Sequence, residues 1–326
     1  MSFFNRALWR KTVVESLILL VPCTAVILGF TWLFVYLTNN LAIAKLPTLL
    51  KYILPSQFLQ LNSMSLSDWG TRRGLLSAIY IHPIVEFTCI VWAVVRGSAA
   101  VSGEISRGTM EMLLAQPISR SAIVFTNAVT TALGSAVLAG ATLVGLTIGV
   151  ATVPQRLVEE PAQSEVVAQK PEGGIGGFVA KLGAEFIKPM FTAPAKPPEP
   201  EKIEIPFYFP AAVILCLYVA AIGAVSTLAS SWDHYRFRTI GIIGIWGVLQ
   251  IVMDVAVRWV SSSNPLKYLR YGTLKTCFEP QQVLFCEPGE AARFMWLYCS
   301  VFVVVIVVCY ALAMAIFSRR DLPTPL

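Results

Sequence analysis

Six long runs of apolar residues alternate with polar and charged segments along the chain. A helix needs roughly 20 apolar residues to cross about 30 Å of hydrocarbon, because each residue adds about 1.5 Å. Backbone groups in hydrocarbon must bond within their own segment, which favours helices over open strands. The pattern predicts an all-α integral membrane protein with a single transmembrane domain over residues 1–326. The expected spans are residues 14–37, 75–95, 121–150, 207–230, 239–257 and 294–317.

Composition agrees with this pattern. The chain is 56% hydrophobic and only 13% charged, whereas a soluble domain is nearer 25% charged. Lipid must therefore be much of its solvent, and we expect membrane lipid as a partner. The formal net charge of +6 does not indicate nucleic-acid binding, because Lys and Arg in membrane proteins mostly flank the spans.

The basic residues also predict the orientation. An even number of spans places both termini on one side, and 10 of the 25 Lys and Arg residues fall in the short segments 1–13, 96–120, 231–238 and 318–326. Short cytoplasmic segments are enriched in these residues, so we expect cytoplasmic N- and C-termini. The long segment 154–206 would then be an external Pro-rich loop.

The segment between the second and third spans reads GEISRGTMEMLLAQPISR. As a helix it would place Glu104, Arg107 and Glu111 on one face, where opposite charges can pair. Pro117 should end this helix, and Ser119 should cap the third span. The expected product is a short amphipathic helix on the cytoplasmic surface, which on physical grounds alone is equally an ordinary interfacial helix.

This segment resembles the cytoplasmic signature of type-2 ABC transporter permeases. The opening NRALWRKTVVES and the closing SRRDL resemble the entry helix and the ending of the same family. The matching signature residues are Gly103, Glu104, Arg107, Gly108, Thr109, Glu111, Leu113, Leu114, Pro117, Ser119 and Arg120.

The resemblance implies a division of labour. Such a permease dimerises, with an identical or a different chain, and docks cytosolic ABC ATPase subunits at a coupling helix after the second span. It lies in the cell membrane, plasma or inner, as a multi-pass protein. The residues that would couple this chain to the ATPase are Glu104, Arg107, Gly108, Thr109, Glu111, Pro117 and Arg120.

The chain carries no GxxxxGK[ST] phosphate loop, so that motif cannot bind ATP here. We therefore expect ATP and Mg to be bound by the partner ATPase and no cofactor to be bound by this chain. Neither HExxH nor GxSxG occurs. The chain is not expected to be an enzyme by itself.

Glu86 lies within the second span, with His82 four residues earlier. A charge at mid-bilayer costs at least a few kcal/mol, so Glu86 should face the bundle interior, stay protonated or pair. One interpretation is a translocation path lined by His82 and Glu86. The other is a protonated Glu86 bonded to a neighbouring helix, or a shorter span that leaves His82 and Pro83 at the outer interface.

Cys277 and Cys286 lie nine positions apart in the third outer loop. A disulfide is permitted outside the cytoplasm, and two reduced thiols are the alternative. His82 and His234 are the only histidines, and no Cys/His cluster has metal-site spacing. We expect no tightly bound metal.

The leading functional hypothesis is the membrane subunit of an ATP-driven exporter, a transport protein whose substrate the sequence does not identify. The alternative is a structural membrane anchor, through which an ATPase drives an assembly or motility machine. A third interpretation, an intramembrane enzyme, has only His82 and Glu86 in its favour.

Overall fold

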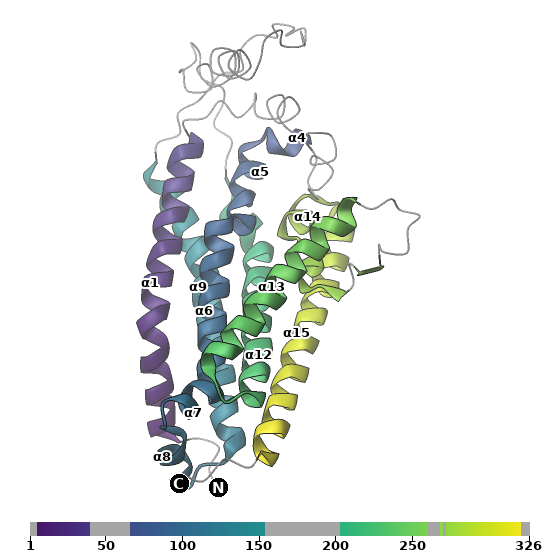
Figure 1. Ribbon diagram of the computed structural model, residues 1–326. Helices are drawn as coiled ribbons and strands as arrows, with labels where there is room; N and C mark the ends of the chain where they lie inside the picture. Colours follow the sequence, from purple (N-terminus) through teal and green to yellow (C-terminus); the bar gives the residue numbers. More distant parts are fainter. Residues whose placement is uncertain (1–4, 40–65, 154–202, 260–267, 270–271, 321–326) are drawn as a thin grey trace, which may run out of the picture.

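A computed structural model describes residues 5–39, 66–153, 203–259, 268–269 and 272–320, and the elements in these ranges are all helical (Figure 1). The longest helices are α1 (Arg6–Asn39), α6 (Pro83–Ser98), α9 (Arg120–Thr152), α12 (Phe209–Trp232), α13 (Arg236–Trp259) and α15 (Pro288–Arg319). Shorter elements are α4 (Leu66–Trp69), α5 (Arg72–Ser77), η2 (Ala78–Ile81), η3 (Ala99–Gly103), α7 (Glu104–Ser106), α8 (Met110–Leu114), η5 (Ile205–Tyr208), η7 (Leu274–Cys277) and α14 (Pro280–Phe285).

Six helical segments in the described ranges are long and apolar enough to cross a membrane, which confirms the predicted number of spans. Each predicted span lies inside one of them. The six are Arg6–Asn39, Arg72–Ser106, Arg120–Thr152, Ile205–Trp232, Arg236–Val257 and Gly289–Arg319. The predicted Pro-rich loop lies outside the described residues, apart from its last few positions.

The six spans lie side by side as one bundle (Figure 1). α12 is the most buried span and contacts α6, α9 and α15, while α1 packs along α9. α1 begins and α15 ends at the same end of the bundle, where α7 and α8 also lie. We call this the terminal end and the opposite one the distal end.

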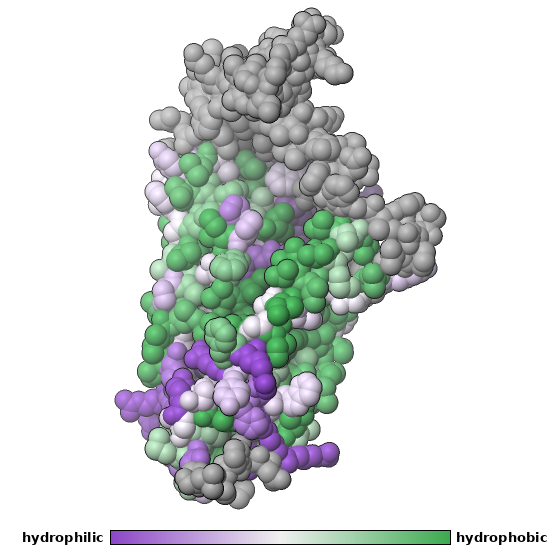
Figure 2. All heavy atoms as spheres, in the orientation of Figure 1, coloured by the Kyte–Doolittle hydropathy of each residue, from purple (hydrophilic) through white to green (hydrophobic). Residues whose placement is uncertain are grey.

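Small residues let the central helices approach closely. A Cβ built on Gly134 would lie 2.2 Å from the Trp92 ring, and one on Gly223 would lie 2.5 Å from the Thr131 methyl. Glycines commonly allow such contact between helices in membranes. The outward faces are apolar instead, and Figure 2 shows hydrophobic side chains over most of the visible bundle with hydrophilic ones gathered toward the terminal end.

The second span is not one continuous α-helix. α5 ends at Ser77 and the 3₁₀ turn η2 that follows it ends at Ile81; His82 is extended, and α6 begins with Pro83 at its first position. Proline fits there because its missing N–H would be unsatisfied in any helix start. At the other end of α6, five residues adopt the π-helix η3. Both ends of this span therefore depart from regular α-helix.

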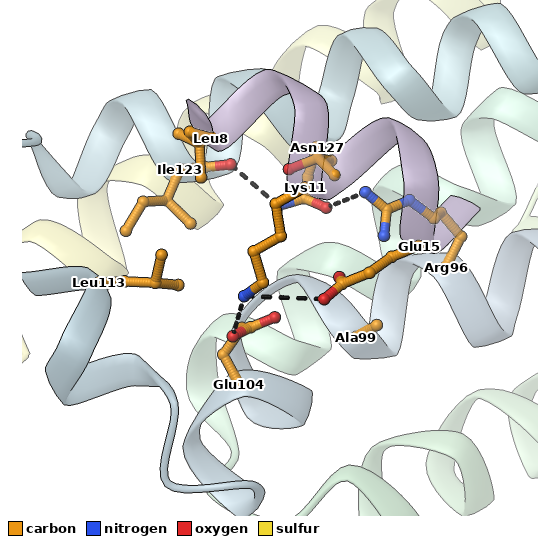
Figure 3. Close-up of a pocket in the computed structure, with 10 residues that line it drawn as sticks. Leu8, Lys11, Glu15, Arg96, Ala99, Glu104, Leu113, Ile123 and Asn127 are labelled. Atoms are coloured by element: carbon orange, nitrogen blue, oxygen red, sulfur yellow. Dashed lines mark hydrogen bonds and ion pairs between the residues drawn. The ribbon is translucent and has the colours of Figure 1, made fainter. Parts of the chain in front are cut away.

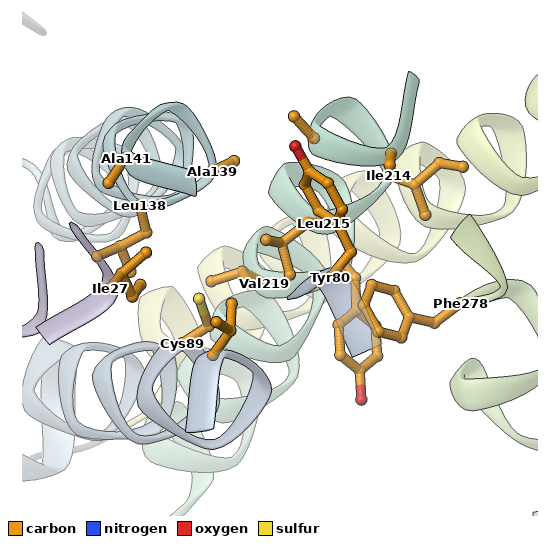
Figure 4. Close-up of a cluster of buried hydrophobic side chains, with 14 of the residues drawn as sticks. Ile27, Tyr80, Cys89, Leu138, Ala139, Ala141, Ile214, Leu215, Val219 and Phe278 are labelled. Atoms are coloured by element: carbon orange, nitrogen blue, oxygen red, sulfur yellow. The ribbon is translucent and has the colours of Figure 1, made fainter. Parts of the chain in front are cut away.

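Two apolar clusters form the interior. The larger fills the bundle from its middle to the distal end, and Figure 4 shows part of it around Ile27, Cys89, Leu138 and Val219. The smaller lies at the terminal end and includes Leu8 of α1 and Phe317 of α15. Because the smaller cluster also takes in Met110 and Leu113, the short helix α8 is packed onto the bundle.

Candidate functional site

The segment after the second span is two short helices joined by a turn, rather than the single helix that the sequence pattern predicts. α7 ends at Ser106, and α8 begins at Met110. Gly108 between them has φ +71°, a conformation that glycine adopts without steric cost. This glycine breaks the helix, so Glu111 does not continue the face that carries Glu104. We call residues 104–117 the coupling turn.

Glu104 is buried under this turn, with 5% of its surface exposed. Its carboxylate accepts three hydrogen bonds of 2.6 Å, from Lys11 Nζ, Arg107 Nη2 and Thr109 Oγ1. The i,i+3 pairing of Glu104 with Arg107 that the sequence allowed is present. Lys11 is 93 residues away in the chain, and no local sequence signal identified it as a partner.

A wider set of polar groups continues from Glu104 into the bundle (Figure 3). Lys11 also pairs with Glu15 at 3.7 Å. Arg96, only 6% exposed, donates to Asn127 Oδ1 at 2.6 Å and to Thr130 Oγ1 at 3.3 Å. The cavity among these side chains measures about 10 Å³, close to the space that one water needs. This region is a packed polar network and is too small for a transported molecule.

The π-helix that precedes the coupling turn is bonded to α12. Ser230 Oγ lies 3.2 Å from the Val101 N–H and 2.9 Å from the Ser102 N–H, both of which donate to it. Ser226 Oγ donates to the Val94 carbonyl at 3.0 Å. These serines satisfy backbone groups that an irregular helix leaves open. The coupling turn is consequently tied to α1 through Lys11, and the η3 segment that leads into it is tied to α12 through Ser230.

The other face of the coupling turn is exposed. Met112 has 65% of its surface accessible, whereas Met110 in the same helix has 2%. Of the predicted coupling residues, Arg107, Gly108, Glu111 and Pro117 are exposed, Thr109 and Arg120 are half-buried, and Glu104 is buried. The exposed set mixes charge with a large apolar side chain, which suits a protein contact.

Arg120 faces the last span instead of this exposed face. Its guanidinium donates to the Phe317 carbonyl at 3.2 Å, also donates to the Arg320 carbonyl, and lies 5.7 Å from the Phe317 ring centre. The neighbouring Ser119 side chain accepts from Ala122 N at 3.2 Å, so the predicted cap of the third span is confirmed. Pro117 lies between α8 and α9, where the predicted helix end is found.

At the distal end, Glu86 is paired. Its carboxylate accepts from Lys275 Nζ, and the Tyr218 hydroxyl donates to it at 3.4 Å. His82 caps α6 by accepting from Ile84 N at 3.2 Å, and its ring lies 4.4 Å from that of Phe30. Among the alternatives left open by the sequence, the structure selects pairing for Glu86.

Cys277 and Cys286 are not joined to each other in the structure, and the disulfide considered from the sequence stays a prediction. The helix α14 lies between them in the chain. Across the described ranges, no group of three His, Cys, Asp or Glu side chains is placed to hold a metal ion.

A comparison with protein families finds one match of nearly full length. The model of a family described as ABC-2 family transporter protein matches residues 11–322. No curated protein matches the chain. The family match covers all six spans almost completely and includes the coupling turn.

Proposed function

This chain belongs to the ABC-2 family of transporter proteins, and on that premise we propose that it couples ATP hydrolysis in a separate cytosolic subunit to export of a substrate. Family membership makes it a multi-pass membrane permease of an ABC transporter, a transport subunit without catalytic activity of its own. The direction of transport and the ATPase partner are the parts that we propose.

The observation that carries this proposal is that the coupling turn has one side bonded to the bundle and the other side exposed. Its inner side is fixed to α1 by the bond between Glu104 and Lys11, and the adjoining η3 is fixed to α12 by Ser230. Its outer side offers Arg107, Glu111 and Met112 to a partner. A push on the exposed side would therefore reach α1 through a short, charge-assisted bond and α12 through the neutral bonds of the adjoining η3.

We also propose that the terminal end faces the cytoplasm of a cell that carries the protein in its plasma or inner membrane. Arg6, Arg10, Arg238, Arg319 and the coupling turn all lie at this end. Basic residues favour the cytoplasmic side, where ATP is present. The ATP and Mg would be held by the partner, since no phosphate loop occurs in this sequence.

A second permease chain, identical or different, would complete the transporter. The span α13 supports this proposal because few of its side chains are buried by the rest of the chain. His82 and Glu86 remain our proposal for residues along the translocation path. Glu86 supports it because an ionisable side chain within a span commonly marks such a path.

The experiment is purification of the tagged chain in mild detergent, with mass spectrometry of the proteins that accompany it. We expect a stoichiometric soluble protein carrying a phosphate loop. Purification of each of the charge-reversal variants Arg107→Glu and Glu111→Lys should recover about tenfold less of this protein. The reason is that like charges facing each other across an interface weaken binding, here by about 1.4 kcal/mol.

The matched control is Glu290→Lys, which reverses an exposed charge at the distal end and should leave recovery unchanged. A chain that purifies reproducibly without any ATPase would refute the proposal. So would equal recovery from the two coupling-turn variants and the control.

A further inference from the structure

The first turns of α1 form a cationic groove at the terminal end of the bundle. The groove measures about 830 Å³, and the described residues that line it are Arg6, Ala7, Arg10, Lys11 and Val14. Arg6 and Arg10 are exposed, and Lys11 is half-buried. None of these lining residues is acidic, so the groove presents a positive surface that suits an anion. We call it the α1 groove.

The same side of α1 becomes apolar immediately beyond the groove. Arg10, Val14, Leu17 and Val21 are three or four residues apart, so they share one face of the helix. The three apolar side chains have between 43% and 60% of their surface exposed. They lie in the part of α1 that is apolar enough to cross a membrane, where lipid chains are the solvent. Arg10 therefore lies where a charged surface meets hydrocarbon, at the level of the lipid headgroups.

Lys11 connects the α1 groove to the interior of the terminal end. It lines both this groove and the small cavity beside the coupling turn. Its ammonium donates to Glu104 at 2.6 Å and lies 3.7 Å from Glu15 (Figure 3). Because the Lys11 side chain is also 32% exposed, an anion in the groove would lie beside the lysine that holds the coupling turn to α1.

We propose that the α1 groove binds the headgroup of an anionic phospholipid, with the phosphate between Arg6 and Arg10 and the acyl chains along the apolar face of α1. Arginine suits this contact because its planar guanidinium can donate two hydrogen bonds to one phosphate. The apolar face continues directly from the groove, which favours a lipid over a free anion or an acidic protein segment. The headgroup also competes with Glu104 for Lys11, so lipid binding is linked to the attachment of the coupling turn.

The experiment is native mass spectrometry of the purified full-length chain in neutral detergent, titrated with phosphatidylglycerol or phosphatidylcholine. Both lipids carry a phosphate, but only phosphatidylglycerol has a net negative charge. We expect it to bind about thirtyfold more tightly, because each of two basic residues contributes about 1 kcal/mol toward an anionic lipid and a factor of ten corresponds to about 1.4 kcal/mol. Equal binding of the two lipids would overturn the proposal.

Removing the two arginines should abolish this preference. The double variant Arg6→Gln with Arg10→Gln should bind both lipids alike, and each single variant should keep a preference of about fivefold. The matched control is Arg293→Gln with Arg319→Gln, which removes two exposed arginines that do not line the groove and should behave like the parent. An equal loss in the control would overturn the assignment to this groove. If the double variant does not fold, the single variants decide.

Two further measurements test the kind of ligand and the link to the coupling turn. Inorganic phosphate that displaces phosphatidylglycerol at equal concentration would overturn the choice of a lipid. Glu104→Gln leaves Lys11 free to turn toward the headgroup, and we expect it to bind phosphatidylglycerol about threefold more tightly. Unchanged affinity in a folded Glu104→Gln variant would overturn the link. These measurements need no ATPase, so their failure is distinguishable from failure to recover an ATPase with the chain.

Discussion

The coupling turn and residues 272–286, the distal segment, are both short pieces that an ion pair between a glutamate and a lysine joins to a span: the coupling turn to α1 through Lys11, and the distal segment to α6 through Glu86. Glu104 accepts three hydrogen bonds, two of them from side chains of the coupling turn itself. Glu86 accepts from Lys275 and from a tyrosine hydroxyl. One carboxylate has several cationic and hydroxyl donors, and the other relies on one lysine for charge. The same chemistry therefore leaves one carboxylate with more than one cation to balance its charge and the other dependent on a single lysine.

The largest effect should come from removing the carboxylate with the most partners. Glu104→Ala leaves Lys11, Arg107 and Thr109 without their shared acceptor, and we expect a loss of about 3 kcal/mol in the free energy of unfolding. Chemical denaturation in detergent, followed by tryptophan fluorescence, measures it. The control Glu111→Ala removes an exposed carboxylate of the same segment and should stay within about 0.5 kcal/mol.

The two lysines should differ if the comparison is correct. Lys11→Gln leaves Glu104 with Arg107 and should cost about 1 kcal/mol, whereas Lys275→Gln leaves Glu86 without a cation and should cost about 2 kcal/mol. Unfolding of the two variants under identical conditions provides the test. Equal losses, or a greater loss for Lys11→Gln, would break the comparison.

A third prediction concerns the shape of the coupling turn. Nothing lies within 4 Å of a Cβ built on Gly108, so Gly108→Ala should cost only the strain of a positive φ, about 1 kcal/mol. The amount of ATPase recovered with this variant should fall by more than the loss in the free energy of unfolding accounts for, because the exposed coupling turn must change conformation. Gly241→Ala, another glycine with open space, is the control; equal recovery from both variants would contradict this expectation.

The smallest effect should come from a neutral bond of the distal segment. Tyr298→Phe removes the hydrogen bond to Gln282 but keeps the ring, so we expect a loss of about 0.5 kcal/mol. Chemical denaturation under the same conditions as for Lys275→Gln measures the loss. A loss as large as that of Lys275→Gln would contradict the greater weight given to the charged bond.

Much of the fold could be predicted from the sequence because hydrocarbon imposes a length and an apolar composition on every span. The cap at Ser119 and the helix end near Pro117 depend on local chemistry, so they too could be predicted from the sequence. The single helix expected over the coupling turn was wrong. Its charge spacing was helical, but Gly108 takes a positive φ that spacing does not reveal.

The partners of the two glutamates could not be predicted in the same way. Lys11 is 93 residues from Glu104, and Lys275 is 189 residues from Glu86. Whether each lysine reaches its glutamate depends on how the six spans pack against one another. The spacing of charged residues along a single helix does not contain that information. For the same reason Arg120, grouped by its motif with the coupling residues, contacts the end of α15 instead.

The sequence by itself determined the membrane setting, the number of spans, the position of the coupling turn and the family resemblance, because these depend on local composition and short motifs. The tertiary structure decided which carboxylate is buried, which face of the coupling turn is exposed and which lysine pairs with Glu86. Those outcomes depend on side chains brought together from distant helices, where burial makes an unpaired charge or polar group costly.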